Sequence, residues 1–104
     1  MKGSTVILVL SILEQEAMYG YQIVNEIEKK SSGLFRLKEG TLYPLLHALE
    51  ADGALESFWR EGDGKRQRRY YRLTDRGRQQ LHARRAEWNL FRSAVDQVIG
   101  ESAT

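Results

Sequence analysis

The sequence contains no cysteine, and this absence excludes several kinds of structure. Disulfide bonds, cysteine-ligated zinc sites and a thiol nucleophile are ruled out, and a chain without cysteine is typical of the reducing cytoplasm, where we expect this protein to be located. The single proline, Pro44, leaves no proline-rich linker. The most apolar stretch, near the N-terminus, is only about ten residues long and too short to span a bilayer. We therefore expect one packed unit of 104 residues without membrane contact.

Positive charge is concentrated in one segment of the chain. Residues 60–78 contain eight basic and three acidic residues, whereas residues 1–59 contain five basic and eight acidic residues. Five of the basic residues lie between Lys65 and Arg72, in the run KRQRRYYR. Proteins normally mix the signs of their surface charges, so this cluster predicts an anionic partner that binds over one face.

Two helices are predicted before residue 31. Residues 4–14 are apolar on nearly every side, which predicts a helix covered by neighbours in the centre of the fold or of a dimer. Residues 19–30 form the second predicted helix, because Tyr19, Ile23 and Ile27 recur on one face.

A third helix is predicted in the run KEGTLYPLLHALEADG. Its aliphatic stripe has helical spacing and consists of Leu42, Leu45, Leu46 and Leu49. Pro44 is compatible only with the first turn of this helix, and Gly53 is placed to form a left-handed cap at its end. The opposite face is available for contact and carries Thr41, Tyr43, His47 and Glu50.

Two segments of alternating apolar and polar residues, 54–60 and 68–74, predict β-strands. The turn sequence EGDGK between them joins the strands into a hairpin, which must pack on the helices because an isolated hairpin is only marginally stable. The expected apolar faces are Leu55 with Trp59 on the first strand and Tyr71 with Leu73 on the second.

A long last helix is predicted from Asp75 to Ile99, with Thr74 as its N-cap. Apolar residues recur along it at spacings of three and four positions, at Trp88, Phe91, Val95 and Val98. Such a seam packs against another helix along its length. A chain this short has little left to cover it, so we expect these residues to form a homodimer interface.

This order of elements predicts a mainly α fold with a small β-hairpin. Residues 1–74 would form a winged helix-turn-helix DNA-binding domain, and residues 75–104 a C-terminal dimerisation helix. In such a fold the third helix enters the major groove of double-stranded DNA, and the hairpin, or wing, follows the adjacent backbone. The predicted groove-facing residues are Lys38, Thr41, Tyr43 and His47. The predicted wing residues are Lys65, Arg66, Arg68 and Arg69.

Three blocks of the sequence resemble those of the PadR-like transcriptional regulators. They are YGYQI at 19–23, EGTLYPLLHALEADG at 39–53 and RRYYRLTDRG at 68–77. The resemblance implies a cytoplasmic repressor that binds a palindromic operator as a homodimer and releases it on binding a small molecule. It implies DNA-binding roles for Tyr19, Tyr21, Lys38, Thr41, Tyr43, Pro44, Lys65, Arg66 and Arg68. Trp88 falls where some short relatives have an aromatic residue that lines a ligand pocket at the dimer interface.

Several alternatives remain open at this point. The basic hairpin is also compatible with a protein-interaction module that binds an acidic protein partner. Tyr19 and Tyr21 either pack the second helix on the third or contact phosphate through their hydroxyls, and the two roles are compatible. Tyr71 is expected in the core, whereas Tyr70 is left open between a strand role and a base-stacking role. Trp88 either contacts a ligand or only packs the dimer.

An enzyme is not expected. No nucleophile elbow, phosphate-binding glycine loop or metal-binding cluster organises the polar residues. His47 and His82 lack the companion ligands of a zinc site, so we expect neither a metal nor another cofactor.

Overall fold

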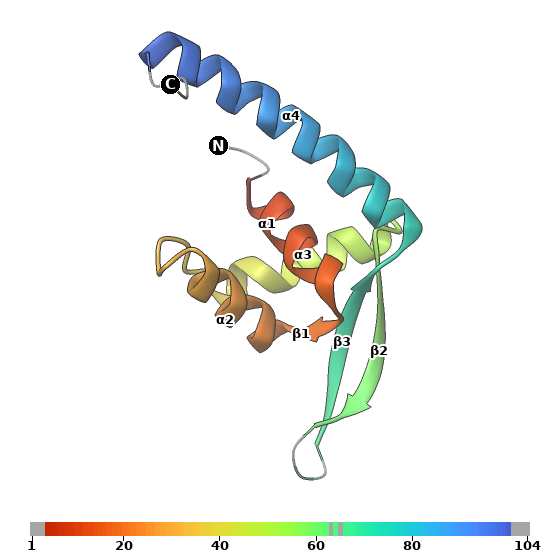
Figure 1. The fold of residues 1–104 in the computed structure, drawn as a ribbon. Coiled ribbons are helices and arrows are strands. Elements are labelled where there is room, and N and C mark those ends of the chain that lie inside the picture. Colours follow the sequence, from red (N-terminus) through yellow and green to blue (C-terminus); the bar gives the residue numbers. More distant parts are fainter. Residues whose placement is uncertain (1–3, 63, 65, 101–104) are drawn as a thin grey trace.

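Four helices and three strands make up the computed structural model, which describes residues 4–62, 64 and 66–100 (Figure 1). The helices are α1 (Ser4–Gln15), α2 (Gly20–Lys30), α3 (Glu39–Ala51) and α4 (Asp75–Ile99). The strands are β1 (Met18–Tyr19), β2 (Leu55–Glu61) and β3 (Gln67–Leu73). The fold is therefore mainly helical with a small sheet, as the sequence predicts.

The sheet contains the predicted hairpin and one strand that the sequence does not predict. Strands β2 and β3 pair antiparallel, and β1 pairs antiparallel with the other edge of β3. In this pairing Met18 lies opposite Tyr71 and Tyr19 opposite Tyr70. Tyr19 is consequently the N-cap of α2 rather than its first residue, and its backbone N–H donates to the Gln22 side chain.

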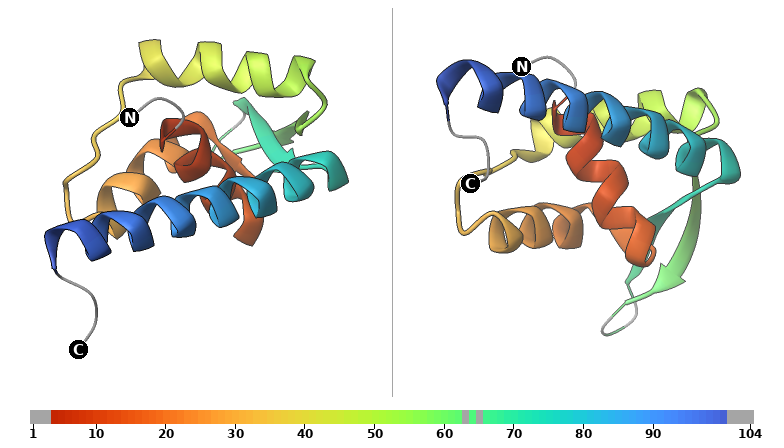
Figure 2. Two further views of the ribbon diagram at one scale, coloured as in Figure 1. Left: turned by 90° about the horizontal axis from the view of Figure 1, so that it is seen from above. Right: turned by 45° about the horizontal axis from the view of Figure 1, so that its top comes forward.

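Helix α1 lies at the centre of the fold, as its apolar sequence predicts. It passes between α4 and the layer that contains α2 and α3 (Figure 2). The core combines its buried side chains with those of α2, α3, the sheet and the first turns of α4, and its largest fully buried members are Tyr71, Leu10, Ile23, Leu42, Leu46, Leu55 and Leu81. Among the described residues, none of the helices has the length and apolar character needed to cross a membrane.

The leucine stripe of α3 is confirmed, but the predicted position of Pro44 in its first turn is wrong. The stripe is buried at Leu42, Leu46 and Leu49, and Leu45 is half-buried. The helix begins earlier than expected, because the amides of Thr41 and Leu42 both donate to the Lys38 carbonyl. Pro44 therefore lies in the second turn, where its ring removes one helical hydrogen bond. Gly53 adopts the predicted left-handed conformation, with φ of 84°.

The hairpin packs on the helices through one face. Leu55, Tyr71 and Leu73 are almost fully buried there, as predicted. Trp59 lies on the same face of β2 as Leu55, as predicted, but its side chain is 64% exposed. The strands extend past the helices toward the tip of the hairpin (Figure 1). Trp59 belongs to the second half of β2, which leads to that tip.

Helix α4 starts from a closely packed corner between β3 and the beginning of β2. Thr74 is its N-cap, as predicted, and its hydroxyl accepts from the Gly77 amide at 3.1 Å while donating to the Gly53 carbonyl at 2.5 Å. The Gly77 backbone lies so close to the Ala54 carbonyl oxygen that a Cβ atom would overlap with it. The absence of a side chain at Gly77 therefore allows α4 to leave the sheet at this corner.

Candidate nucleic-acid interface

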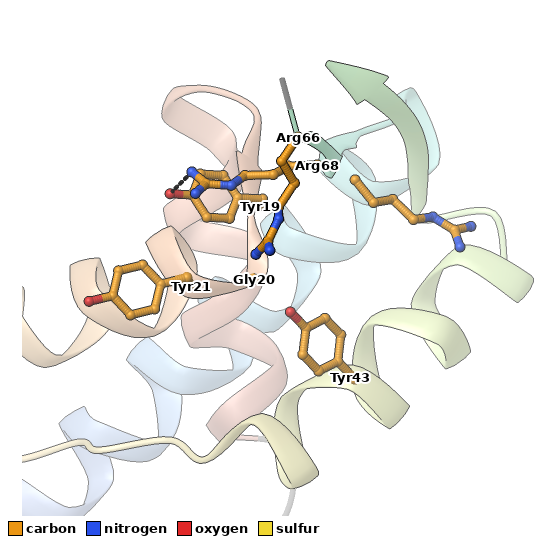
Figure 3. A pocket seen from close by; sticks show the side chains of 7 residues that line it. Tyr19, Gly20, Tyr21, Tyr43, Arg66 and Arg68 are labelled. Carbon is orange, nitrogen blue, oxygen red and sulfur yellow. Dashed lines mark hydrogen bonds between the residues drawn. The ribbon is translucent and has the colours of Figure 1, made fainter. Parts of the chain in front are cut away.

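An open cleft of about 490 Å³ lies between the start of α2, the α3 helix and the β3 side of the hairpin (Figure 3). It is lined by three tyrosines, three arginines and one glycine: Tyr19, Gly20, Tyr21, Tyr43, Arg66, Arg68 and Arg69. All of these side chains except the glycine were predicted to bind DNA. The structure thus brings residues from three separate sequence blocks together in one basic cleft without a carboxylate among its described lining residues.

The outward side of α3 continues this surface. Lys38, at the N-cap, is exposed, and so are four further predicted positions. These four are Thr41, Tyr43, Pro44 and His47. They leave polar and aromatic groups available to a partner, whereas the leucine stripe on the other side of the helix is buried.

Gly20 fixes the position of Tyr43 relative to α2. A Cβ atom at Gly20 would lie 2.5 Å from the Tyr43 hydroxyl oxygen and 2.8 Å from the adjoining ring carbon. A side chain at this position would displace the Tyr43 ring, so the observed approach of the two residues uses the missing Cβ atom of Gly20. The contact places the Tyr43 ring against the start of α2, at the floor of the cleft (Figure 3). Sequence reasoning noted the YGY run but missed this role of its glycine.

Tyr19 and Arg68 contact one another across the cleft. The Arg68 Nη1 atom donates to the Tyr19 hydroxyl at 2.6 Å, and the guanidinium carbon lies 4.5 Å from the ring centroid (Figure 3). Tyr21 is exposed, and its ring stacks at 6.5 Å from that of Tyr19. Tyr19 therefore packs against the wing through its ring, and its hydroxyl accepts from Arg68 at the cleft. The phosphate contact considered for this hydroxyl stays a prediction.

Arg69 has a carboxylate partner that sequence reasoning missed. Its Nη2 atom lies 3.0 Å from the Glu50 Oε1 atom, and the Ser57 hydroxyl donates to the other carboxylate oxygen at 2.5 Å. The hydrogen bond from Ser57, together with the positive charge of Arg69, lowers the pKa of Glu50. Glu50 therefore joins α3 to both strands of the hairpin, and the DNA-binding role predicted for Arg69 competes with this ion pair.

Arg66 lies nearest the hairpin tip among the cleft arginines. It is exposed, and its side chain has no carboxylate partner within the part of the chain that the structure describes. Lys65, the other residue predicted for the tip, lies outside the described residues.

A second hollow, of about 440 Å³, lies between α1 and α4 and contains Trp88. Its apolar lining comes mainly from Ile7, Leu8, Phe35 and Trp88. Arg85 also borders it and forms a two-pronged ion pair with Glu14 at the end of α1, with N–O distances of 2.8 and 3.2 Å. Hydrogen bonding to Arg85 lowers the pKa of Glu14.

The predicted apolar seam of α4 is largely uncovered in the single chain. Trp88 and Phe91 stack with ring centroids 5.9 Å apart, and both are exposed, while Val95 is half-buried. Val98 is 86% exposed. Leu90 and Ile99 are also exposed and were not part of the predicted seam.

Comparisons with known proteins agree with this architecture. Residues 9–83 match the model of the transcriptional regulator PadR-like family. A transcriptional regulator from Mycobacterium tuberculosis is 43% identical over 79 residues, which span 75% of this chain and 70% of that protein.

Similar folds occur among solved structures. A transcriptional regulator from Clostridium thermocellum has a TM-score of 0.80 at 31% identity, covering 99% of this chain and 96% of that one. Bacillus subtilis PadR, solved in complex with operator DNA, has a TM-score of 0.71 at 25% identity, covering 80% of this chain but 46% of PadR. These likenesses confirm the predicted fold, a winged helix-turn-helix with a small sheet.

The Glu50 contacts predict a pH-dependent stability. Because folding lowers the pKa of Glu50, its contribution to the free energy of unfolding is present at neutral pH and is lost as the pH falls through the folded-state pKa. We expect Glu50→Gln to lower the free energy of unfolding by about 1–2 kcal/mol at pH 7. The difference from wild type should shrink as the pH falls from about 5 to about 3.

Urea denaturation at a series of pH values measures this difference. Ser57→Ala removes the hydrogen bond that contributes most to the shift and should reproduce part of the effect. If the difference in the free energy of unfolding between Glu50→Gln and wild type stayed constant between pH 7 and pH 3, the ionised Glu50 contacts would not contribute to stability.

Proposed function

Because this chain belongs to the PadR-like transcriptional regulator family, we propose that it binds double-stranded DNA and regulates transcription by occupying an operator. The observation that carries the proposal is the basic cleft, where Tyr19, Arg66 and Arg68 meet the exposed side of α3. The similarity to Bacillus subtilis PadR, a protein solved with operator DNA, supports the same partner for this chain. The family is one of regulators, which agrees with a non-enzymatic role in the cytoplasm.

The two parts of the surface have different tasks in this proposal. Arg66 and Arg68 contact phosphates, which fix the register of the protein on the duplex. Lys38, Thr41, Tyr43 and His47 face the major groove, where base edges carry sequence information. Substitutions in the wing should therefore weaken binding to all sequences alike, whereas substitutions on α3 should change the preferred site.

We further propose that residues 1–74 form the DNA-binding head and that residues 75–104 join two copies into a homodimer. The exposed apolar side chains of α4 support this, since water contact with Phe91 and Val98 is unfavourable unless a second helix covers them. Two heads related by a two-fold axis bind a palindromic operator. Their half-sites then lie about 34 Å apart, one turn of DNA.

An operator-bound dimer acts as a repressor in this scheme, and a small molecule releases it from DNA. The hollow beside Trp88 supports a ligand site, because it is mostly apolar and lies where α4 meets α1. A ligand shifts the equilibrium only if it binds one arrangement of the two heads better than the other.

Trp88 fluorescence tests the ligand site. In a Trp59→Phe background, which removes the only other tryptophan, binding in the hollow should change the emission of Trp88 during titration with aromatic and cationic compounds. An unchanged spectrum across the panel would exclude those compounds as ligands of the hollow.

The alternative function is a protein-interaction module whose basic hairpin binds an acidic protein. The exposed charge of Arg66 favours DNA and an acidic protein alike, so binding to the two partners has to be compared directly. A gel shift with genomic fragments in the presence of competitor DNA distinguishes the two, since only the regulator retards specific fragments.

The wing contacts predict a change in salt dependence. Each phosphate contact contributes about 0.9 to the slope of log affinity against log salt concentration. Arg66→Gln should therefore reduce the slope by about 0.9 and weaken binding to operator and unrelated duplexes alike.

Arg78→Gln is the matched control, because Arg78 belongs to the same basic segment but lies on α4 and pairs with Asp75. Its slope should equal that of wild type. An unchanged slope in Arg66→Gln would remove this residue from the DNA contacts.

The dimer is tested by sedimentation in dilute solution. Wild type should sediment at twice the chain mass of 12.0 kDa. Val98→Asp places a charge on the seam without disturbing the core of the subunit, since this side chain is exposed, and should produce monomers. Gln97→Asp, at the neighbouring exposed position, should remain dimeric. A wild-type chain that sediments as a stable monomer, with and without DNA, would contradict the proposal.

A further inference from the structure

The hairpin has an outer face that the proposed DNA contacts leave largely unused. Side chains alternate along strands, so the residues between those of the packed face point the opposite way. The outer face consists of Glu56, Phe58 and Arg60 on β2 and Arg68, Tyr70 and Arg72 on β3. Three of its six members are arginines, and one of these, Arg68, also lines the basic cleft. The outer face is therefore continuous with the candidate DNA-binding surface.

Each arginine of the outer face lies over an aromatic ring. The guanidinium carbon of Arg60 is 4.4 Å from the centroid of Tyr70 and 5.4 Å from that of Phe58. Arg72 lies 4.8 Å from the Phe58 centroid. The rings themselves are in contact, with Phe58 and Tyr70 at 5.8 Å and Tyr70 and Tyr19 at 5.4 Å. These contacts order the arginine side chains before any partner binds.

The charges on the outer face are not balanced within it. Arg60 lies directly opposite Arg68 in the strand register, and like charges in such a pair destabilise a sheet. Glu56, the one carboxylate of this face, pairs with Arg72 at 2.5 Å. Arg60 is exposed and has no carboxylate partner among the described residues. An anion bound beside Arg60 and Arg68 would offset the repulsion between the two charges.

We propose that Arg60, held over Tyr70 and Phe58, is a further DNA contact that binds a backbone phosphate beside the half-site read by α3. This inference rests on the proposed function, because it takes duplex DNA as the partner of the cleft. Arg68 connects the cleft to Arg60, so a duplex seated in the cleft brings its next phosphates toward the outer face. A guanidinium that is already ordered on a ring loses less freedom when it binds phosphate.

The proposal also gives a role to the two aromatic residues that lie beneath Arg60. Tyr70 is buried by its neighbours, and Phe58 is half-buried, so neither ring is free to stack on a base. Their role in this proposal is to position the guanidinium of Arg60. Tyr70, whose role the sequence left open, is thus a positioning residue for the phosphate contact.

The test compares Arg60→Gln with Arg72→Gln, which lies on the same face but already has a carboxylate partner. In DNA titrations at several salt concentrations, Arg60→Gln should reduce the salt slope by about 0.9 and weaken binding roughly five- to tenfold at 0.1 M salt. Hydroxyl-radical footprints should lose protection at the outer edge of the half-site. Arg72→Gln should retain the wild-type slope and footprint.

Phe58→Leu keeps an apolar side chain but removes one of the two rings beneath Arg60, and it should weaken binding by less than Arg60→Gln. The melting temperature of Arg60→Gln reports any structural role, because the substitution removes the like-charge pair with Arg68 together with the contacts on Tyr70 and Phe58. A lower melting temperature with an unchanged slope would show a structural role and overturn the proposal. If wild type binds no duplex, the proposed function fails as well; if wild type binds but Arg60→Gln has the same slope, this inference alone fails.

Discussion

The position of the basic hairpin depends on the burial of its inner face against the helices. A two-stranded hairpin has too little apolar surface to be stable alone in water. Here Leu55 and Leu73 are buried, Tyr71 is only 1% exposed, and β1 adds a third strand beside β3. Glu50 adds contacts from α3 to Ser57 on β2 and to Arg69 on β3. These contacts hold the arginines of the sheet in a fixed direction relative to α3, although the tip lies beyond the helices.

Much of the fold follows from sequence periodicity, because periodicity records which side of an element faces the core. The leucines of α3 and the burial of Tyr71 and Leu73 follow from such periodicity, and the Thr74 cap has a local signal of its own; the structure confirms all of them. Strand β1 has only two residues, which are too few to show alternation, and its pairing with β3 depends on residues far away in the chain. The exposure of Trp59 has a similar cause, since alternation gives the face of a residue but not where the covering helices end.

The candidate site is predictable in its composition but not in its contacts. Charge clustering and the exposed side of α3 identify the arginines and Tyr43, and the family resemblance adds Tyr19 and Tyr21. The structure draws the lining of the cleft from β1, α2, α3 and the β3 side of the hairpin. Contacts such as Arg68 with Tyr19, or Arg69 with Glu50, join side chains many positions apart, and no local pattern encodes such a pair. The close approach of Tyr43 to Gly20 depends on the angle between α2 and α3. The stacking of Arg60 requires the strand register, which places it opposite Arg68.

The corner at Gly77 gives α4 the mechanical properties of a lever. The helix contains 25 residues and is about 37 Å long, and its first turn fits so closely against Ala54 that the pivot is sharply defined. A rotation of about 10° at that pivot moves the far end of a helix of this length by about 6 Å. In the proposed dimer joined through α4, a small change in the angle of α4 at Gly77 therefore becomes a large change in the distance between the two DNA-binding heads. The ion pair between Arg85 and Glu14 joins α4 to α1 about 12 Å along the helix from Gly77, so it restrains that angle from a point on the lever arm.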